Sequence, residues 1–209
     1  MQRIPLESIW RVFAKQYQLS EMQVSQFESY AHELLKWNQQ CDLTAITNEH
    51  DVVELHFDDS LKVTQFMDFS KITSCCDVGS GAGFPGIPLK ILYPHLTLYL
   101  LEVQHKRVEF LEYMVDTLKL DNVLVMRVDW RTFLRKTEFG IDLFCARASL
   151  DPEELIRMFK PSCVYNDVPL IYWASRMWKS VPKVESYIKT DWEYHVGGRK
   201  RRLILLQNK

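Results

Sequence analysis

Cysteine, net charge and long apolar runs are all scarce in this sequence of 209 residues. The five cysteines are odd in number and include no C-x-x-C pair with the spacing of metal ligands, so we predict reduced, structural thiols and no metal site. No apolar run approaches the roughly 20 residues that a membrane-spanning helix needs. The first ten residues also lack the charged, apolar and small-residue regions of a secretory signal. These absences predict a cytoplasmic protein rather than a secreted or membrane-embedded one.

An excess of positive charge is absent as well, because 26 basic residues stand against 27 acidic ones. The distribution is uneven: residues 1–60 hold four basic and ten acidic side chains, whereas the remainder holds 22 and 17. Near the end of the chain, Arg199, Lys200, Arg201 and Arg202 follow one another without interruption. Such a run creates a local positive field at which a polyanion could dock. The solvated edge of a hairpin is an alternative of equal weight.

The length fits one domain, or a domain with an appendage, and a hydrophobic share of 47% is enough for a sizeable core. Residues 1–68 are predicted to be helical. Within them, Ser20 and Gln23 have the form of a capping box before a long amphipathic helix, and Thr47 with Asn48 marks a second helix start.

Beyond the helical part, short apolar runs alternate with helical segments. The predicted strands are 73–78, 97–101, 123–126, 141–145 and 170–173, and the predicted helices lie near 85–92, 105–118 and 152–159. The end predicts an antiparallel hairpin, with strands 192–196 and 203–206 joined by two glycines. Strands that alternate with helices predict a parallel α/β sheet covered on both faces. We therefore divide the chain into a helical subdomain, 1–68, and a sheet domain, 69–209.

Glycine is sparse overall but concentrated in one place. Four of the seven glycines fall in the run Asp77-Val-Gly-Ser-Gly-Ala-Gly-Phe-Pro-Gly86, directly after an apolar strand. Glycine permits positive φ and a close approach of the backbone to a ligand, as a loop between a strand and a helix N-terminus requires. The predicted ligand contacts in this loop are Asp77, Gly79, Gly81, Gly83 and Phe84.

The residues of the loop limit the kind of ligand that it can bind. The last three glycines match the dinucleotide spacing G-x-G-x-x-G, which alone is weak evidence. Asp77 adds negative charge, which suits a cationic amino-acid ligand better than a diphosphate. Pro85 and Pro88 also remove two N–H donors that phosphate oxygens would need. The pattern D-x-G-x-G-x-G instead resembles motif I of the class I S-adenosylmethionine methyltransferases.

Two acids follow the next two predicted strands. Glu102 stands 23 residues after Gly79, where an acid commonly binds ribose hydroxyls. Asp129 follows the third strand, where its carboxylate could accept an adenine amino group while the backbone of Val128 meets the ring. A role for Asp129 as a turn residue or helix N-cap has comparable weight.

Further segments accompany the loop in order: Trp37-Asn38, Leu43-Thr44-Ala45-Ile46, His56-Phe57-x-Asp59-Ser60-Leu61, the run Gly-x-Gly-Phe-Pro-Gly-Ile-Pro88, Lys106-Arg107-x-x-Phe110-Leu111 and Arg147-Ala148. Together they closely resemble the RsmG (GidB) family, bacterial methyltransferases that modify N7 of a guanine in 16S ribosomal RNA. The run G-x-G-F-P-G-I-P is far more specific than a generic glycine motif, and the segments span most of the chain.

The resemblance implies a Rossmann-like class I methyltransferase fold for the sheet domain, with a helical extension before it and a hairpin after it. It implies S-adenosylmethionine as the cofactor and 16S rRNA or the 30S subunit as the partner of a monomeric enzyme. The implied cofactor contacts are Gly79, Phe84, Val128, Asp129 and Arg147. The basic run Arg199–Arg202 then becomes the candidate RNA-binding surface.

Two segments depart from the family pattern. Where the family has Ser-Arg-Ala after the fourth strand, this chain has Ala146-Arg147-Ala148. Where the family has a Gly-rich turn and then Leu-Lys-Gly, this chain has Pro161-Ser-Cys163 and Tyr172-Trp-Ala-Ser175. The last segment borders the active-site mouth in this fold, so the substrate is less defined than the cofactor. A methyltransferase for a protein or small molecule, a catalytically silent RNA-binding relative and, more distantly, a nicotinamide oxidoreductase stay open.

Guanine N7 carries an in-plane lone pair and no proton, so methyl transfer to it requires positioning rather than a general base. The sequence agrees, because it contains no Asp/Asn-Pro-Pro-Tyr motif for exocyclic amines and Cys163 is not a convincing nucleophile. We therefore predict no catalytic acid–base residue.

Arg147 is expected to pair with the methionine carboxylate of the cofactor, because a guanidinium fork onto N7 would occupy the lone pair that must attack. An ion pair at the sheet edge is the alternative. His56, Asp58 and Asp59 resemble a metal cluster at first sight, but adjacent residues do not share a helix face. We predict instead that His56 is a packed, hydrogen-bonded core group on a helix that lies across the entrance to the cofactor domain.

Overall fold

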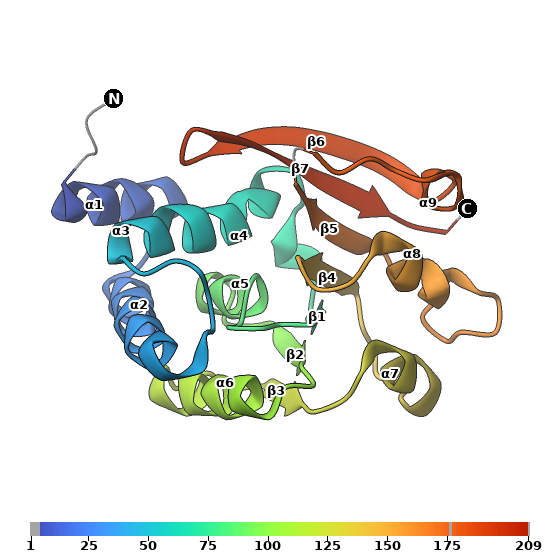
Figure 1. The fold of residues 1–209 in the computed structure, drawn as a ribbon, viewed down its shortest axis with the longest axis horizontal. Helices are drawn as coiled ribbons and strands as arrows, with labels where there is room; N and C mark the ends of the chain where they lie inside the picture. Colours follow the sequence, from blue (N-terminus) through green and yellow to red (C-terminus); the bar gives the residue numbers. More distant parts are fainter. Residues whose placement is uncertain (1–4, 176, 209) are drawn as a thin grey trace.

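The computed structural model describes residues 5–175 and 177–208 (Figure 1). Up to Lys71 its regular elements are helical, as predicted. They are α1 (Leu6–Tyr17), α2 (Glu21–Cys41), α3 (Glu49–Val52), the π-helical segment η1 (Val53–Asp58), α4 (Asp59–Leu61), and the 3-10 turns η2 (Lys62–Gln65) and η3 (Phe69–Lys71). The predicted capping box starts α2, because the Gln23 N–H donates to Ser20 Oγ and the Ser20 N–H donates to Gln23 Oε1.

A seven-stranded sheet follows the helical part. Its strands are β1 (Ser74–Val78), β2 (Thr97–Leu101), β3 (Val123–Met126), β4 (Leu143–Arg147), β5 (Leu170–Ala174), β6 (Ile188–Val196) and β7 (Arg199–Leu206). The order is β3-β2-β1-β4-β5-β7-β6, in which the first five strands of the chain pair in parallel and β7 lies antiparallel between β5 and β6. The predicted α/β class and C-terminal hairpin are confirmed. Strand β4 extends beyond its predicted end because the ladder to β5 continues as far as Arg147 opposite Trp173.

Helices cover both faces of the sheet (Figure 1). α5 (Gly86–Leu92) and α6 (His105–Thr117) share one face with the N-terminal helices. The other face carries α7 (Trp130–Lys136), α8 (Pro152–Leu155) with the 3-10 turn η4 (Ile156–Phe159), and α9 (Pro182–Glu185). The short helices α7 and α9 were not predicted. α7 buries only Trp130 and Phe133, too few apolar positions to show a helical period.

The N-terminal helices and the sheet share one hydrophobic core. It contains Phe27 and Phe57 of the helical part together with Leu98 and Ile171 of the sheet, all fully buried. The N-terminal helices are therefore packed as a layer on the sheet, and the division of the chain at residues 68 and 69 stays a prediction. No helix among the described residues is long and apolar enough to cross a membrane.

Candidate functional site

A cavity of about 450 Å³ opens at the carboxyl ends of β1, β2 and β4. Ligands of open parallel sheets bind at this edge, beside the point where the strand order reverses, and the volume lies within the range of small-molecule sites. The predicted cofactor contacts that line the cavity are Gly79, Gly81, Phe84, Glu102, Val128, Asp129 and Arg147. Asp77 and Gly83 are not among the lining residues.

The glycine loop owes its shape to close contacts with its neighbours. Gly79 and Gly83 have φ values of 69° and 95°, a region that L side chains disfavour. A Cβ at Gly79 would lie 2.5 Å from Ser149 Cβ, so the loop touches the segment after β4. A Cβ at Gly83 would instead meet Ile87 and the Tyr30 hydroxyl. Gly83 thus permits packing against α5 and α2, whereas Gly79 lines the cavity.

Asp77 is fully buried beneath the loop. Its Oδ2 accepts the Gly86 N–H at 2.9 Å, and its Oδ1 is buried with no hydrogen-bond partner in the part of the chain that the structure describes. Burial raises the pKa of Asp77 to about 7, although the hydrogen bond from Gly86 and the charge of Arg147 oppose the shift. The side chain therefore ties the end of β1 to the start of α5.

This burial predicts a pH-dependent stability. An unfolded aspartate loses its proton near pH 3.8, whereas folded Asp77 keeps it up to about pH 7, so the folded state holds the extra proton between these values. Relative to an Asp77→Asn variant, the free energy of unfolding of the wild type is expected to fall by roughly a few kcal/mol as pH rises through this window. Above it, the difference should level off. Urea unfolding at successive pH values measures the difference, and a pH-independent difference would contradict the buried, protonated carboxyl.

Glu102 organises the loop and faces the cavity. Its Oε1 accepts the N–H groups of Val103 and Gln104 at 2.8 and 2.9 Å, and its Oε2 accepts the Gly81 N–H at 2.9 Å. A carboxylate has about four acceptor positions, so one remains. Arg107 Nη1, at 3.8 Å from Oε2, is too distant to fill it. The free position is where the predicted ribose contact would form.

Asp129 is the N-cap of α7. Its Oδ1 accepts the Thr132 N–H at 3.0 Å and its Oδ2 accepts the Thr132 hydroxyl at 2.6 Å. These hydrogen bonds lower the pKa of Asp129. The Val128 N–H donates to Met126 O at 2.9 Å, so Val128 can offer a ligand its carbonyl and side chain but not its N–H. The helix cap and the predicted adenine contact therefore fall on the same residue.

Arg147 connects the cavity to the N-terminal helices. Its side chain is 14% exposed, and its Nη1 lies 3.3 Å from Asp59 Oδ2. The guanidinium also donates to Leu55 O at 2.9 Å and to His56 O at 3.3 Å. Both carbonyls belong to the π-helical segment η1, whose wider turn changes the main-chain pairing of an α-helix. The sequence left open an ion pair at the sheet edge as the role of Arg147. The structure contains an ion pair, but it is buried and joins Arg147 to the N-terminal helices.

His56 and Phe84 form the aromatic part of the cavity wall. Their rings stack with centroids 4.3 Å apart, and Phe84 also stacks with Tyr30 at 5.3 Å. Because Phe84 is only 7% exposed, little of its ring is open to a ligand. His56 Nε2 lies 2.8 Å from Thr44 Oγ1, and Arg147 Nη2 lies 2.9 Å from His56 Nδ1. His56 is therefore packed and hydrogen-bonded, as predicted, and it also lines the cavity.

Several polar residues of the wall were not predicted as site residues, and Thr44 and Ser149 are two of them. Among the described residues Ser149 Oγ is buried without a hydrogen-bond partner, and Ala148 before it has a positive φ of 50°. Strained backbone and unpaired buried polar atoms concentrate at ligand sites. Thr44 belongs to the segment Leu43–Ile46, whose only sequence signal is its resemblance to the family. Ser149 gave no signal, because its contact with Gly79 joins residues 70 positions apart.

The basic run lies on β7, where successive side chains point to opposite faces of the sheet. On one side, Lys200 Nζ lies 2.7 Å from Glu193 Oε2, and Arg202 pairs with Asp191. The positive charge of this side is therefore largely compensated. The four predicted RNA-binding residues do not form one continuous patch.

The other side of β7 faces the N-terminal helices. Arg201 lies opposite Tyr194, whose hydroxyl donates to Asp59 Oδ1 at 2.7 Å. Arg201 Nε is buried, and no described residue is its hydrogen-bond partner. Arg199, two residues before Arg201, is exposed. This pair lies beside the turn of the β6–β7 hairpin, which packs against η1.

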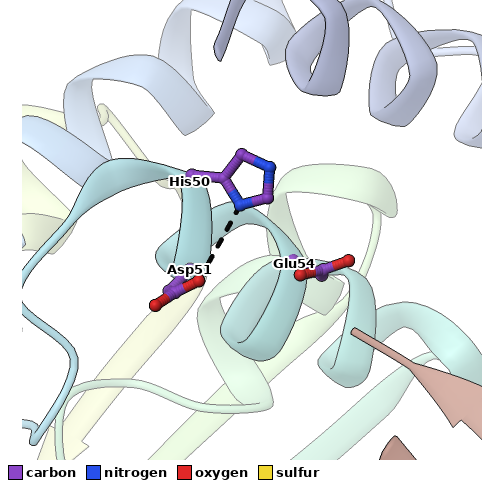
Figure 2. A group of neighbouring side chains, drawn as sticks. All are labelled: His50, Asp51 and Glu54. Atoms are coloured by element: carbon purple, nitrogen blue, oxygen red, sulfur yellow. Dashed lines mark ion pairs between the residues drawn. The ribbon is translucent and has the colours of Figure 1, made fainter. Parts of the chain in front are cut away.

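A second cluster of ionisable groups lies on α3 and η1, outside the cavity lining. His50, Asp51 and Glu54 each place one ligand atom within 4.8 Å of the others (Figure 2). His50 Nδ1 is 3.8 Å from Asp51 Oδ1, and Asn48 Nδ2 donates to Asp51 Oδ2 at 2.8 Å. None of these residues was predicted as a site, and the absence of a metal requirement stays a prediction.

The departing segment Tyr172–Ser175 lies at the end of β5 and just beyond it. Trp173 Nε1 donates to Asp59 O at 3.0 Å, and Tyr172 packs edge-on against Trp178. Residues 172–175 are not among those that line the cavity. The departing segment therefore contacts the main chain of Asp59 and lies outside the cavity wall.

Solved structures share this fold. The delta-N METTL16 methyltransferase domain has a TM-score of 0.59, covering 88% of this chain and 97% of that one at 14% identity. TrmK of M. capricolum, solved in complex with S-adenosyl-homocysteine, has a TM-score of 0.54, covering 72% and 67% at 14% identity. The putative methyltransferase yhhF from Escherichia coli also has a TM-score of 0.54, covering 73% and 88% at 15% identity. The fold is that of the class I methyltransferases, with the cavity at the ligand edge of the sheet.

Sequence comparison identifies the family within this fold. The model of the family described as rRNA small subunit methyltransferase G matches residues 23–190, so the chain belongs to this family and the resemblance drawn from its motifs is confirmed. A ribosomal RNA small subunit methyltransferase G from Bacillus velezensis is 40% identical over 144 residues, which are 68% of this chain and 60% of that protein. One from Geobacillus sp. strain WCH70 is 45% identical over 132 residues, or 62% and 56%. The chain thus spans less than two thirds of the length of these relatives.

Proposed function

We propose that this protein transfers a methyl group from S-adenosylmethionine to N7 of a guanine in 16S ribosomal RNA. The observation that carries the proposal is the cavity, whose walls keep hydrogen-bonding capacity for a nucleoside that bears an amino acid. Among the described residues Glu102 retains a free acceptor position and Ser149 Oγ has no hydrogen-bond partner, and the guanidinium of Arg147, paired with Asp59, lines the same cavity. When bound, S-adenosylmethionine would supply a methyl group on a positively charged sulfur.

The strand order puts the residues that would bind the two ends of the cofactor on opposite sides of β1. Glu102 and Asp129 follow β2 and β3, on one side of β1, and would hold the ribose and the adenine. Arg147 ends β4, on the other side of β1, and would stand near the methionine end. Guanine N7 has no proton to lose, so these residues would act by positioning, which contributes up to roughly 7–11 kcal/mol in favourable cases.

The substrate part of the proposal is supported by the relatives, which are named ribosomal RNA small subunit methyltransferases. The partner would be 16S rRNA or the 30S subunit, and the enzyme would act in the cytoplasm as a monomer. Sedimentation of the protein at micromolar concentration tests the last point directly.

Two measurements test the function. S-adenosylhomocysteine should bind saturably at one site per chain. The protein should also transfer labelled methyl groups to 30S subunits or 16S rRNA from cells that lack it, with the label recovered as N7-methylguanosine. Absence of cofactor binding would overturn the whole proposal, and binding without transfer would indicate the silent RNA-binding relative. Label in a protein or small molecule instead would overturn the RNA substrate.

The two sides of β7 allow a matched test of RNA contact. Because Lys200 and Arg202 are paired with acids, we expect Arg199 and Arg201 to supply most of the contact with phosphate. The double variant Arg199→Gln/Arg201→Gln should weaken 30S binding and flatten the plot of log affinity against log salt by about one to two units. Lys200→Gln/Arg202→Gln is the control and should change the slope less. Equal effects of the two variants, or binding that does not depend on salt, would contradict the assignment.

A further inference from the structure

The partners of His56 determine which of its ring nitrogens carries hydrogen. Arg147 Nη2 lies 2.9 Å from His56 Nδ1. A guanidinium has only donors, so Nδ1 accepts and carries no proton. Burial and the charge of Arg147 lower the pKa of His56 well below its usual value, so the ring is neutral and its hydrogen is on Nε2. The Nε2–H therefore donates to Thr44 Oγ1, 2.8 Å away.

The Thr44 hydroxyl is left as a donor only. Its oxygen accepts from His56 Nε2 and also from the Ile46 N–H at 3.1 Å. A hydroxyl has two acceptor positions and one hydrogen, so both acceptor positions are filled and the hydrogen remains. Asn38 holds the residue in place, because its Nδ2 donates to Thr44 O at 2.9 Å and its Oδ1 accepts the Thr44 N–H at 2.8 Å. The cavity wall thus carries a rigid hydrogen-bond donor.

This donor lies on the Arg147 side of the cavity. Thr44 is linked through His56 to Arg147 at the end of β4. Glu102 instead follows β2, on the other side of β1. In the proposed function the ribose and adenine occupy the Glu102 side. The Thr44 side is then left for the methionine end and for the base that receives the methyl group.

We propose that the Thr44 hydroxyl binds O6 of the target guanine and thereby distinguishes guanine from adenine, an inference that rests on the proposed function. On the edge that carries N7, guanine presents O6 as a second acceptor, whereas adenine presents the N6 amino group as a donor. A hydroxyl that can only donate binds the first and opposes the second. Its contact with O6 leaves the N7 lone pair free. The N7–C bond then forms as the S–C bond breaks, the bonding pair stays on sulfur, the positive charge passes to the purine, and no proton moves.

Replacing the target guanine by 2-aminopurine tests the inference, because this base keeps N7 and lacks O6. On the 2-aminopurine RNA the wild type is expected to lose about tenfold in kcat/KM. Thr44→Val should lose about tenfold on the guanine RNA and little more on the 2-aminopurine RNA. The comparison between the two proteins cancels the intrinsic difference in reactivity between the bases. Thr44→Ser keeps the hydroxyl and should restore the preference for guanine, and the affinity for S-adenosylhomocysteine should be unchanged in all three proteins.

The possible outcomes distinguish failure of this inference from failure of the proposed function. If the wild type and Thr44→Val discriminate equally between the two RNAs, the inference fails and the function stands. If Thr44→Val loses affinity for S-adenosylhomocysteine and serine restores it, the hydroxyl serves the cofactor and the inference also fails. If the wild type transfers no methyl group to RNA, both fail. Nitrogen-15 NMR of the His56 ring near pH 7 should show the Nε2–H tautomer, and the Nδ1–H tautomer would remove the donor from Thr44.

Discussion

Replacement of Arg147 by methionine is expected to lower the free energy of unfolding by about 3–5 kcal/mol and to abolish binding of S-adenosylhomocysteine. The stability loss follows from Asp59, which is 2% exposed and would keep, among the side chains of residues 5–175 and 177–208, only the Tyr194 hydroxyl as a partner. A buried carboxylate without its cation is costly because water cannot replace the lost charge. The binding loss follows because Arg147 lines the cavity and holds η1 beside it.

Arg147→Lys separates the two effects. The ammonium keeps the charge opposite Asp59, so most of the stability should return, whereas the planar fork that reaches Leu55 O and the ring of His56 is lost. We therefore expect a folded protein whose affinity for S-adenosylhomocysteine and turnover are reduced. Thermal unfolding and calorimetric titration of both variants provide the measurement. Unchanged affinity and turnover in Arg147→Lys would remove Arg147 from the cofactor site.

Replacement of Gly79 by alanine is expected to weaken the binding of S-adenosylhomocysteine by about a hundredfold. The positive φ of Gly79 alone costs about 1–2 kcal/mol with a side chain. The new methyl group would also lie 2.5 Å from Ser149 Cβ and 3.6 Å from its Cα, atoms that cannot rotate away. The loop and the segment after β4 would have to separate, and both line the cavity.

Gly198→Ala supplies the matched control for this prediction. Gly198 has nearly the same φ, 68°, but a Cβ there meets nothing within 4 Å, and the residue is in the hairpin turn. Its substitution should lower the stability of the protein through backbone strain and leave the affinity for S-adenosylhomocysteine unchanged. Calorimetric titration of the two variants, together with their melting temperatures, distinguishes backbone strain from displacement of the cavity wall. A Gly79→Ala protein that binds like the wild type would show that the loop does not approach the ligand.

The parts of the site that the sequence predicts are those whose residues lie near one another in the chain or at strand ends. The glycine loop is contiguous, so its residues meet whatever the rest of the chain does. Glu102 and Asp129 both lie on the cavity wall because the ends of parallel strands lie at one edge of a sheet, and their contacts with a cofactor stay predictions. The pairing of Arg147 with Asp59 was not predicted, since Asp59 lies 88 positions earlier and no local pattern links the two residues.

The basic run shows a different limit. Four consecutive charges form one feature in a sequence, but a strand sends alternate side chains to opposite sides, and the acids Asp191 and Glu193 come from the neighbouring strand. Which cations remain available for RNA is therefore a property of strand pairing.

The amino-acid sequence by itself determined the α/β class, the family and the position of the glycine loop, because strand periodicity and glycine spacing are local properties of the chain. Only the tertiary structure decided the chemistry of the cavity wall. The hydrogen bonds that join Thr44, His56 and Arg147 connect the loop after α2, a π-helical turn and the end of β4. Their geometry depends on how the N-terminal helices pack on the sheet, which is set by a core shared across the chain rather than by any one segment.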